Sequence, residues 1–406
     1  MYKYNFDKMT DRKGTGSYKW DDCKNAAYPL WVADMDFEAA PPIRKALEDR
    51  VAHGIFGYNI IPDNWYDSYI SWWDRRHNFK MEKDWLVFCT GVVPAISSTV
   101  RKLTEPGDNV VILTPVYNIF FNSIINNGCN VCEVPLIYRR DLLDNHTAGV
   151  ETSSNLDSDC ITRDIYTIDF DNMEKVLSDD KTKLLIFCNP HNPVGRIWSA
   201  DELRKVGELC AKHNVTVLSD EIHCDLTDPG KEYVPFASVS ETCKNISITA
   251  IAPTKAFNIA GMQTAAVSIP NLDLRKKIWR ALNTDEVAEP NSFAIPVTIA
   301  AFNEGEPWLL ELRRYIFENK QIVKDFLSGY PKLKLIPSEA TYLLWIDCND
   351  MGLSGEELSE KLIKETGVYL TAGEEYGKSG AGFLRMNIAC PRKRLEEALE
   401  LLNKVL

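Results

Sequence analysis

Seven short apolar runs, separated by stretches with helical character, lie between about residues 46 and 285. They span residues 85–88, 109–113, 130–134, 184–188, 215–218, 246–251 and 265–269. Because the runs are β-branched and apolar throughout, they are typical of strands that are buried on both faces. Alternation of strands and helices favours a mainly parallel sheet. The pattern predicts an α/β fold whose large domain holds a seven-stranded, mainly parallel sheet.

The chain has 406 residues, which exceeds one typical domain and predicts two. Residues 1–45 show little periodicity, and we expect an N-terminal arm that packs with the small domain. Residues 46–285 form the predicted large domain. Residues 286–406 form a predicted smaller α+β domain, with apolar runs at 340–346 and 382–388 and amphipathic helices at 355–365 and 392–404. The stretch 139–163 breaks the pattern and is expected to be a surface insertion.

The formal charge of −12 disfavours nucleic acid and anionic membranes as general partners. No apolar run approaches the roughly 18–20 residues of a membrane span, and the first residues do not resemble a signal segment. We therefore expect a cytoplasmic protein. Its eleven cysteines should then be mostly free thiols. Cys129 and Cys132 match a C-x-x-C pattern, but they lie in a strand run without a second ligand pair, so no metal site is predicted.

Three polar residues follow three successive strand runs. Asn189, Asp220 and Lys255 are separated by 31 and 35 residues, and each gap fits one strand–helix unit. Ligands of open α/β sheets bind at the carboxyl ends of strands, so the three side chains are expected to share one site. Pyridoxal phosphate (PLP) chemistry needs an amine for a Schiff base and an anion for the pyridinium nitrogen, and this set supplies both. Taken singly, the three residues also fit a turn, a helix cap and a surface charge.

Other candidates surround this set. Gly91 and Val92 open a predicted helix at 94–103, where free N–H groups suit a phosphate, although an ordinary strand–helix turn would look the same. Arg385 lies in an apolar run and could capture a carboxylate or form an intradomain salt bridge. The remaining candidates are a hydroxyl beside the lysine, an aromatic ring, an imidazole and a loop tyrosine: Thr254, Tyr117, His223 and Tyr58.

Together these motifs resemble fold-type I PLP-dependent enzymes, the aspartate-aminotransferase-like group, over nearly the whole chain. Within that group, the chain resembles the cystathionine β-lyase branch of MalY/PatB type. The stretches that carry the likeness are WVADMDF at 31–37, FGY at 56–58, GVVPA at 91–95, NPHNP at 189–193, SDEIH at 219–223, FNIAG at 257–261 and RMNIACP at 385–391. The chain departs from many aminotransferases at Gln263, where an arginine phosphate ligand is common, and at Thr254, where serine is common.

The resemblance implies a role for each candidate. Lys255 would bind PLP covalently and act as the base, Asp220 would pair with the ring nitrogen, and Tyr117 would stack on the ring. Asn189 and His223 would contact the ring hydroxyl. The phosphate would be held by Gly91, Val92 and Thr254, with Tyr58 reaching in from the partner subunit of a homodimer. The substrate would be bound by Arg385 and Ala33.

The implied reaction is β-elimination from cystathionine or a related cysteine S-conjugate, giving a thiol, pyruvate and ammonia. An aminotransferase would use the same residues and need a keto-acid acceptor. A regulatory protein with residual lyase activity is a third alternative. The sequence does not specify the physiological substrate.

Overall fold

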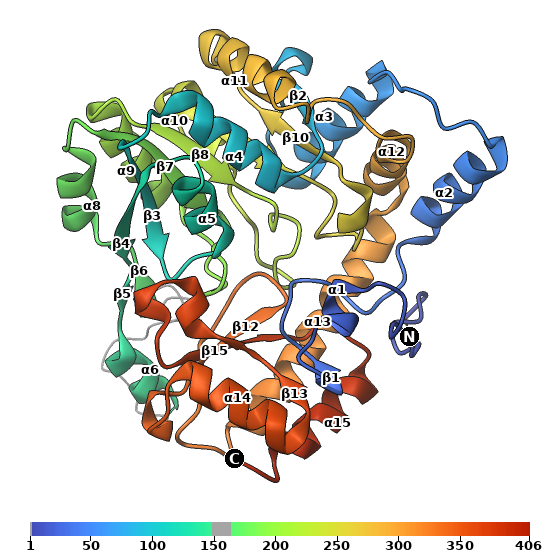
Figure 1. The fold of residues 1–406 in the computed structure, drawn as a ribbon, viewed down its shortest axis with the longest axis vertical. Coiled ribbons are helices and arrows are strands. Elements are labelled where there is room, and N and C mark those ends of the chain that lie inside the picture. The colour runs from blue at the N-terminus through green and yellow to red at the C-terminus, as the bar shows by residue number, and fades with distance from the viewer. Residues whose placement is uncertain (1, 148–163) are drawn as a thin grey trace.

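The computed structural model describes residues 2–147 and 164–406. These residues form one large sheet, one smaller sheet and two short pairs of strands (Figure 1). The large sheet has seven strands in the order β2-β10-β9-β8-β7-β3-β4. Their bounds are β2 Leu86–Cys89, β3 Asn109–Thr114, β4 Asn130–Pro135, β7 Thr182–Cys188, β8 Thr216–Asp220, β9 Ser247–Ile251 and β10 Ala265–Ser268. The strands β9, β8, β7, β3 and β4 pair in parallel, whereas β10 is antiparallel to both of its neighbours. The predicted seven-stranded, mainly parallel sheet is confirmed.

Alternate residues of the strands face two separate apolar cores. Val110 and Ile112 of β3 belong to a core with α4 (Val92–Leu103), α5 (Ile119–Ile125) and α11 (Leu272–Thr284), whereas Val111 and Leu113 face α8 (Phe170–Leu177) and α9 (Ala200–Lys212). Because helices cover both faces of the sheet, a polar side chain at every second strand position would be buried without a hydrogen-bond partner. This burial explains why the strand runs are apolar throughout.

The second sheet is antiparallel and has the order β11-β12-β15-β14. Its strands are β11 Lys334–Leu335, β12 Leu343–Asp347, β14 Thr371–Ala372 and β15 Phe383–Asn387. The long helix α13 (Glu306–Leu327), α14 (Gly355–Thr366) and α15 (Arg392–Leu402) contribute to the apolar core beside it. The amphipathic helices expected at 355–365 and 392–404 match α14 and α15.

The N-terminal segment runs along this second sheet before the chain enters the large one (Figure 1). After α1 (Tyr18–Asp21), strand β1 (Tyr28–Pro29) pairs in parallel with β13 (Val368–Tyr369). The helices α2 (Pro41–His53) and α3 (Asp63–His77) follow, and both contact α12 (Ala294–Glu304). Since α12 was assigned to the small domain, the domain boundary at residue 286 stays a prediction.

Helix α10 (Glu241–Ile246) packs on α9, and a short pair of strands, β5 (Ile137–Tyr138) and β6 (Tyr166–Thr167), flanks the predicted insertion. Helix α6 (Arg140–Thr147) forms its first part, and the rest of the predicted insertion lies outside the described residues. The cysteines of the described ranges are all free thiols. In those same ranges, no helix combines the length and the apolar character needed to cross a membrane.

Candidate active site

The carboxyl ends of β7, β8 and β9 lie side by side and present the three residues that the strand spacing predicted. Asn189 directly follows β7, and its backbone N–H donates to the carbonyl oxygen of Asp220, the last residue of β8, at 2.9 Å. The next residue, Glu221, donates to the carbonyl of Ala250 in β9 at 3.0 Å. Lys255 follows four residues after the end of β9. Adjacent parallel strands therefore bring an amide, a carboxylate and an amine to one edge of the sheet.

Lys255 is held in an environment that makes its amine easier to deprotonate than that of an ordinary lysine. Its Nζ donates to the carbonyl oxygen of Ala33 at 2.6 Å. Burial lowers the pKa of Lys255 to about 8. The negative charges of Asp34 and Asp220 oppose this shift, whereas the positive charge of Arg385 adds to it. An amine with a pKa this close to neutrality can act as a nucleophile and as a base.

Asp220 is a buried carboxylate with few partners. Its Oδ1 accepts from the backbone N–H of Ile222 at 3.2 Å. Burial raises the pKa of Asp220 from 3.8 to about 6, and the Ile222 hydrogen bond and the charge of Lys255 limit the rise. At neutral pH the group is therefore a buried anion, which would be stabilised by a positively charged ring nitrogen.

Several buried polar atoms near this edge have no partner within the described chain. Oδ1 of Asn189 and Nδ1 of His223 are two of them. Burial lowers the pKa of His223 to about 3, and the charges of Lys255 and Arg385 act in the same direction, so its imidazole is neutral. Buried polar atoms are nearly always hydrogen-bonded. These two atoms therefore fit a polar ligand such as the oxygen-bearing ring of PLP.

The start of α4 offers backbone donors to the same site. Gly91 precedes the helix, and no side chain caps the N–H groups that begin at Val92. A Cβ at Gly91 would lie only 3.1 Å from Cδ of the Pro94 ring, so a larger residue would crowd the helix start here. Uncapped N–H groups at a helix start attract anions. Thr254, beside the lysine, is buried. These groups fit a phosphate.

Arg385 reaches the site from β15 of the second sheet. Its Nη1 donates to Oδ1 of Asn192 at 3.3 Å, its Nη2 donates to the carbonyl oxygen of Trp31 at 2.9 Å, and its guanidinium stacks over the Tyr376 ring. All three partners are neutral, and Nε is buried without one. Among the described residues no carboxylate pairs with Arg385, so the alternative of an intradomain salt bridge is not observed. A buried, unneutralised guanidinium fits a substrate carboxylate.

Two tyrosines occupy contrasting positions. Tyr117 follows β3 and is half-buried; burial raises its pKa to about 12, although the charge of Arg385 opposes the rise. Tyr58 lies on the loop between α2 and α3 and is fully exposed. The fold therefore brings Tyr117 to the strand ends but does not bring Tyr58 there within one chain.

Three asparagines and one glutamate around the site were given no role from the sequence. Asn192 contacts Arg385, and Asn387 and Asn258 bind the backbone near Ala33. Glu221 accepts from Asn189 Nδ2 at 3.4 Å and from the hydroxyl of Tyr233. All four residues lie inside the sequence stretches that carry the family resemblance. Their position in those stretches was the only sequence feature that pointed to a role at the site.

A lysine, a buried carboxylate and an uncapped helix start at the carboxyl ends of a seven-stranded sheet define an aminotransferase-like protein. The chain belongs to the aminotransferase class I and II family, whose model matches residues 33–402.

Full-length relatives narrow this assignment. The chain is 41% identical to the cystathionine beta-lyase PatB of Bacillus subtilis, across 97% of this chain and 98% of that protein. It is 30% identical to protein MalY of Escherichia coli, across 98% of this chain and 97% of that protein. The crystal structure of cystalysin from Treponema denticola contains PLP and superposes on this structure with a TM-score of 0.91. The two chains are 34% identical, and the match covers 99% of this chain and 98% of cystalysin. The expected MalY/PatB branch is confirmed.

Proposed function

We propose that this protein is a PLP-dependent C–S β-lyase that acts on cystathionine or a related cysteine S-conjugate. One observation carries the proposal. The amine of Lys255 lies close enough to the buried carboxylate of Asp220 and to the guanidinium of Arg385 for both charges to act on it, and no carboxylate among the described residues pairs with Arg385. The full-length similarity to a cystathionine beta-lyase supports the choice of reaction.

The residues at the strand ends fit PLP. Lys255 would bind it covalently, Asp220 would face the ring nitrogen, and Tyr117 would stack on the ring. The ring oxygen would be contacted by Asn189 and His223, whose buried Oδ1 and Nδ1 atoms have no partner among the described residues. The phosphate would be held by Gly91, Val92 and Thr254. When bound, PLP supplies an electron sink for the bonds at the substrate Cα.

The protein side chains would perform the remaining tasks. Arg385 and the backbone at Ala33 would bind the substrate and orient its Cα–H bond toward Lys255. The amine would take the Cα proton, and its pKa of about 8 suits a base near neutral pH. Asp220 would stay anionic and keep the ring nitrogen protonated. Loss of the thiol from Cβ and hydrolysis by water then give pyruvate and ammonia.

The decisive experiment measures pyruvate and free thiol released from cystathionine by PLP-loaded protein, without any keto acid. Release under these conditions is expected, because β-elimination needs a leaving group and no acceptor. If pyruvate or a new amino acid appears only when a keto acid is added, the protein is an aminotransferase that uses the same lysine. Lys102→Ala, which changes an exposed lysine, is the control for Lys255→Ala.

We further propose that the protein is a homodimer with shared sites and is cytoplasmic. The loop between α2 and α3 exposes four large apolar side chains, Ile55, Phe56, Tyr58 and Ile60. A cluster of this kind is typical of an interface. Tyr58 would then reach the phosphate group in the partner's site. Sedimentation of the PLP-loaded protein, compared with an Ile60→Lys variant, tests the dimer.

A further inference from the structure

The residues 30–37, which we call the N-terminal strap, connect the two cationic side chains of the site. The carbonyl oxygen of Ala33 accepts from Lys255 Nζ at 2.6 Å, and that of Trp31, two residues earlier, accepts from Arg385 Nη2 at 2.9 Å. Lys255 belongs to the loop after the large sheet, whereas Arg385 belongs to the smaller sheet. Carbonyl groups of the strap therefore contact both of these side chains.

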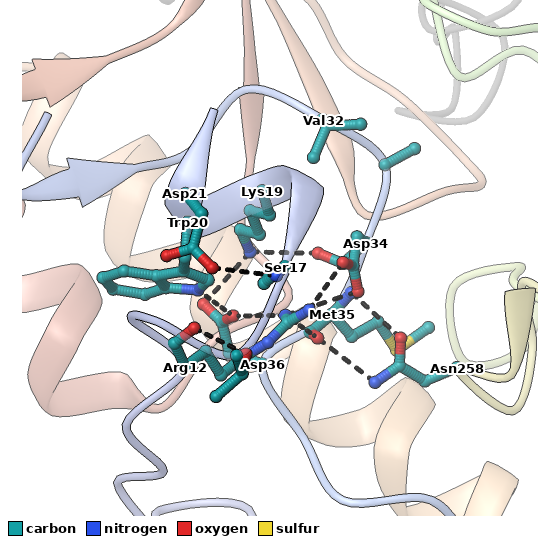
Figure 2. A network of polar contacts seen from close by, with 12 residues as sticks. Arg12, Ser17, Lys19, Trp20, Asp21, Val32, Asp34, Met35, Asp36 and Asn258 are labelled. Carbon is teal, nitrogen blue, oxygen red and sulfur yellow. Dashed lines mark hydrogen bonds and ion pairs between the residues drawn. The ribbon is translucent and has the colours of Figure 1, made fainter. Parts of the chain in front are cut away.

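The strap begins directly after β1 and contains no helix or strand, so side chains bind its backbone groups. Asn258 Oδ1 accepts from Met35 N at 3.2 Å, and Nδ2 donates to the carbonyls of Met35 at 3.1 Å and Phe37 at 2.8 Å. Figure 2 shows Asn258 reaching toward Met35 from the side opposite the charged cluster. Since Asn258 is three residues after Lys255, it fixes the strap to the lysine loop.

A second asparagine fixes the strap to the smaller sheet. Nδ2 of Asn387 donates to the carbonyls of Val32 at 2.6 Å and Asp34 at 2.8 Å, so it binds the residues on either side of Ala33. Asn387 is fully buried and lies two residues after Arg385 on β15. Each active-site cation thus has an asparagine a few residues along the chain that binds the same strap.

A buried ion-pair cluster holds the far end of the strap (Figure 2). Asp36 has no exposed side-chain surface, and its carboxylate contacts Lys19 at 3.0 Å and Arg12 at 2.9 Å. Arg394 lies 3.2 Å from the same carboxylate. Trp20 Nε1 also donates to it at 2.9 Å. Burial would raise the pKa of Asp36, but the charge of Lys19 and the Trp20 hydrogen bond hold it below its usual value. The carboxylate is therefore a fixed anchor at neutral pH.

We propose that Asn258 and Asn387 are positioning residues for Lys255, which act by holding the Ala33 carbonyl against its amine. A neutral amine that donates one N–H to a fixed carbonyl can direct its lone pair only toward the two remaining tetrahedral positions. A general base must meet the Cα proton within hydrogen-bond reach, so loss of this orientation slows proton removal more than it weakens substrate binding. The inference rests on the proposed function only in assigning Lys255 as the base.

The test uses Asn258→Gly and Asn387→Ala. Asn258 has φ +55°, a left-handed conformation that glycine adopts without strain, so Asn258→Gly removes the amide without straining the backbone. Asn214→Gly is the matched control, because Asn214 is exposed and has φ +56°. Asn387 lies 129 positions from Asn258, and its Nδ2 binds the strap rather than the lysine loop. A change at Lys255 in this variant therefore cannot come from distortion of the lysine loop.

The first readout is the pKa of the Lys255 amine in PLP-free protein, obtained by acetylation with acetic anhydride across pH 6–11 and mass spectrometry of the Lys255 peptide. Burial is the largest cause of the low pKa, so release of the strap should raise it from about 8 toward 10.5, by about one pH unit, in both variants. The second readout is kcat of the PLP-loaded enzyme, which should fall about tenfold or more with KM little changed.

Asn214→Gly should match the wild type in both measurements. If Asn258→Gly or Asn387→Ala folds and leaves the Lys255 pKa unchanged, the proposal is overturned. If one variant does not fold, the other decides. The acetylation experiment is independent of lyase turnover, so a wild type that releases no pyruvate refutes the proposed function without affecting this result.

Discussion

Nη1 of Arg385 lies 3.3 Å from Oδ1 of Asn192, so the guanidinium of the smaller sheet is tied to the loop that follows β7 of the large sheet. The two residues are 193 positions apart, and both are buried. The amide oxygen orients the guanidinium without neutralising it. A substrate carboxylate can therefore still form a two-point contact with this arginine.

Arg385→Lys should raise KM for cystathionine with a smaller change in kcat. Lysine keeps the charge but loses the planar, two-donor geometry, and a hydrogen bond between charged groups contributes about 1.5–3 kcal/mol. We expect kcat/KM to fall about 10- to 150-fold. Steady-state kinetics check this, and an unchanged KM would show that the substrate carboxylate binds elsewhere.

Asn192→Asp should also raise KM, by about tenfold or more, because it places a carboxylate against Arg385 at nearly the same position. This internal ion pair would compete with the substrate carboxylate. Asn192→Ser, which removes the contact without adding charge, is the matched control and should have a smaller effect. Equal KM values for the two variants would contradict the argument.

Asp220→Asn should stabilise the PLP-free protein at neutral pH. The pKa of Asp220 is raised from 3.8 to about 6, so the folded state holds its proton more tightly than the unfolded chain does. The wild type therefore loses stability as pH rises from about 4 through 6, and the loss amounts to about 2–3 kcal/mol above pH 6.

Urea unfolding of both PLP-free proteins between pH 4 and 8 measures this difference. The variant should unfold at a higher urea concentration than the wild type at pH 7 and at the same urea concentration near pH 4. The same variant should lose lyase activity when loaded with PLP, because the ring nitrogen loses its anion. A variant that is less stable at pH 7 would show that the Asp220 carboxylate is favourably solvated.

A mixture of Lys255→Ala and Tyr58→Ala should recover activity that neither variant has alone, if sites are shared between subunits. Mixed dimers have one site with both defects and one intact site. After random exchange at equal concentrations, about a quarter of the wild-type activity is expected. Pyruvate release before and after subunit exchange measures this. No recovery, with mixed dimers demonstrated, would place Tyr58 outside the partner's site.

The sequence by itself determined the large sheet and the residues at its strand ends. Strands buried on both faces are apolar at every position, so all seven were visible as short runs. Because parallel strands end at one edge, the spacing of Asn189, Asp220 and Lys255 was enough to predict that they lie together. These features follow from local pattern and strand connectivity.

Only the tertiary structure decided what surrounds those residues. The segment 30–37 has no periodicity, and its conformation is set by Asn258, Asn387 and the charges around Asp36, which lie far apart in the sequence. The same holds for Arg385, whose partners Trp31 and Asn192 come from two other segments. Backbone groups outside helices and strands must find partners wherever the folded chain provides them, and no local pattern records that choice.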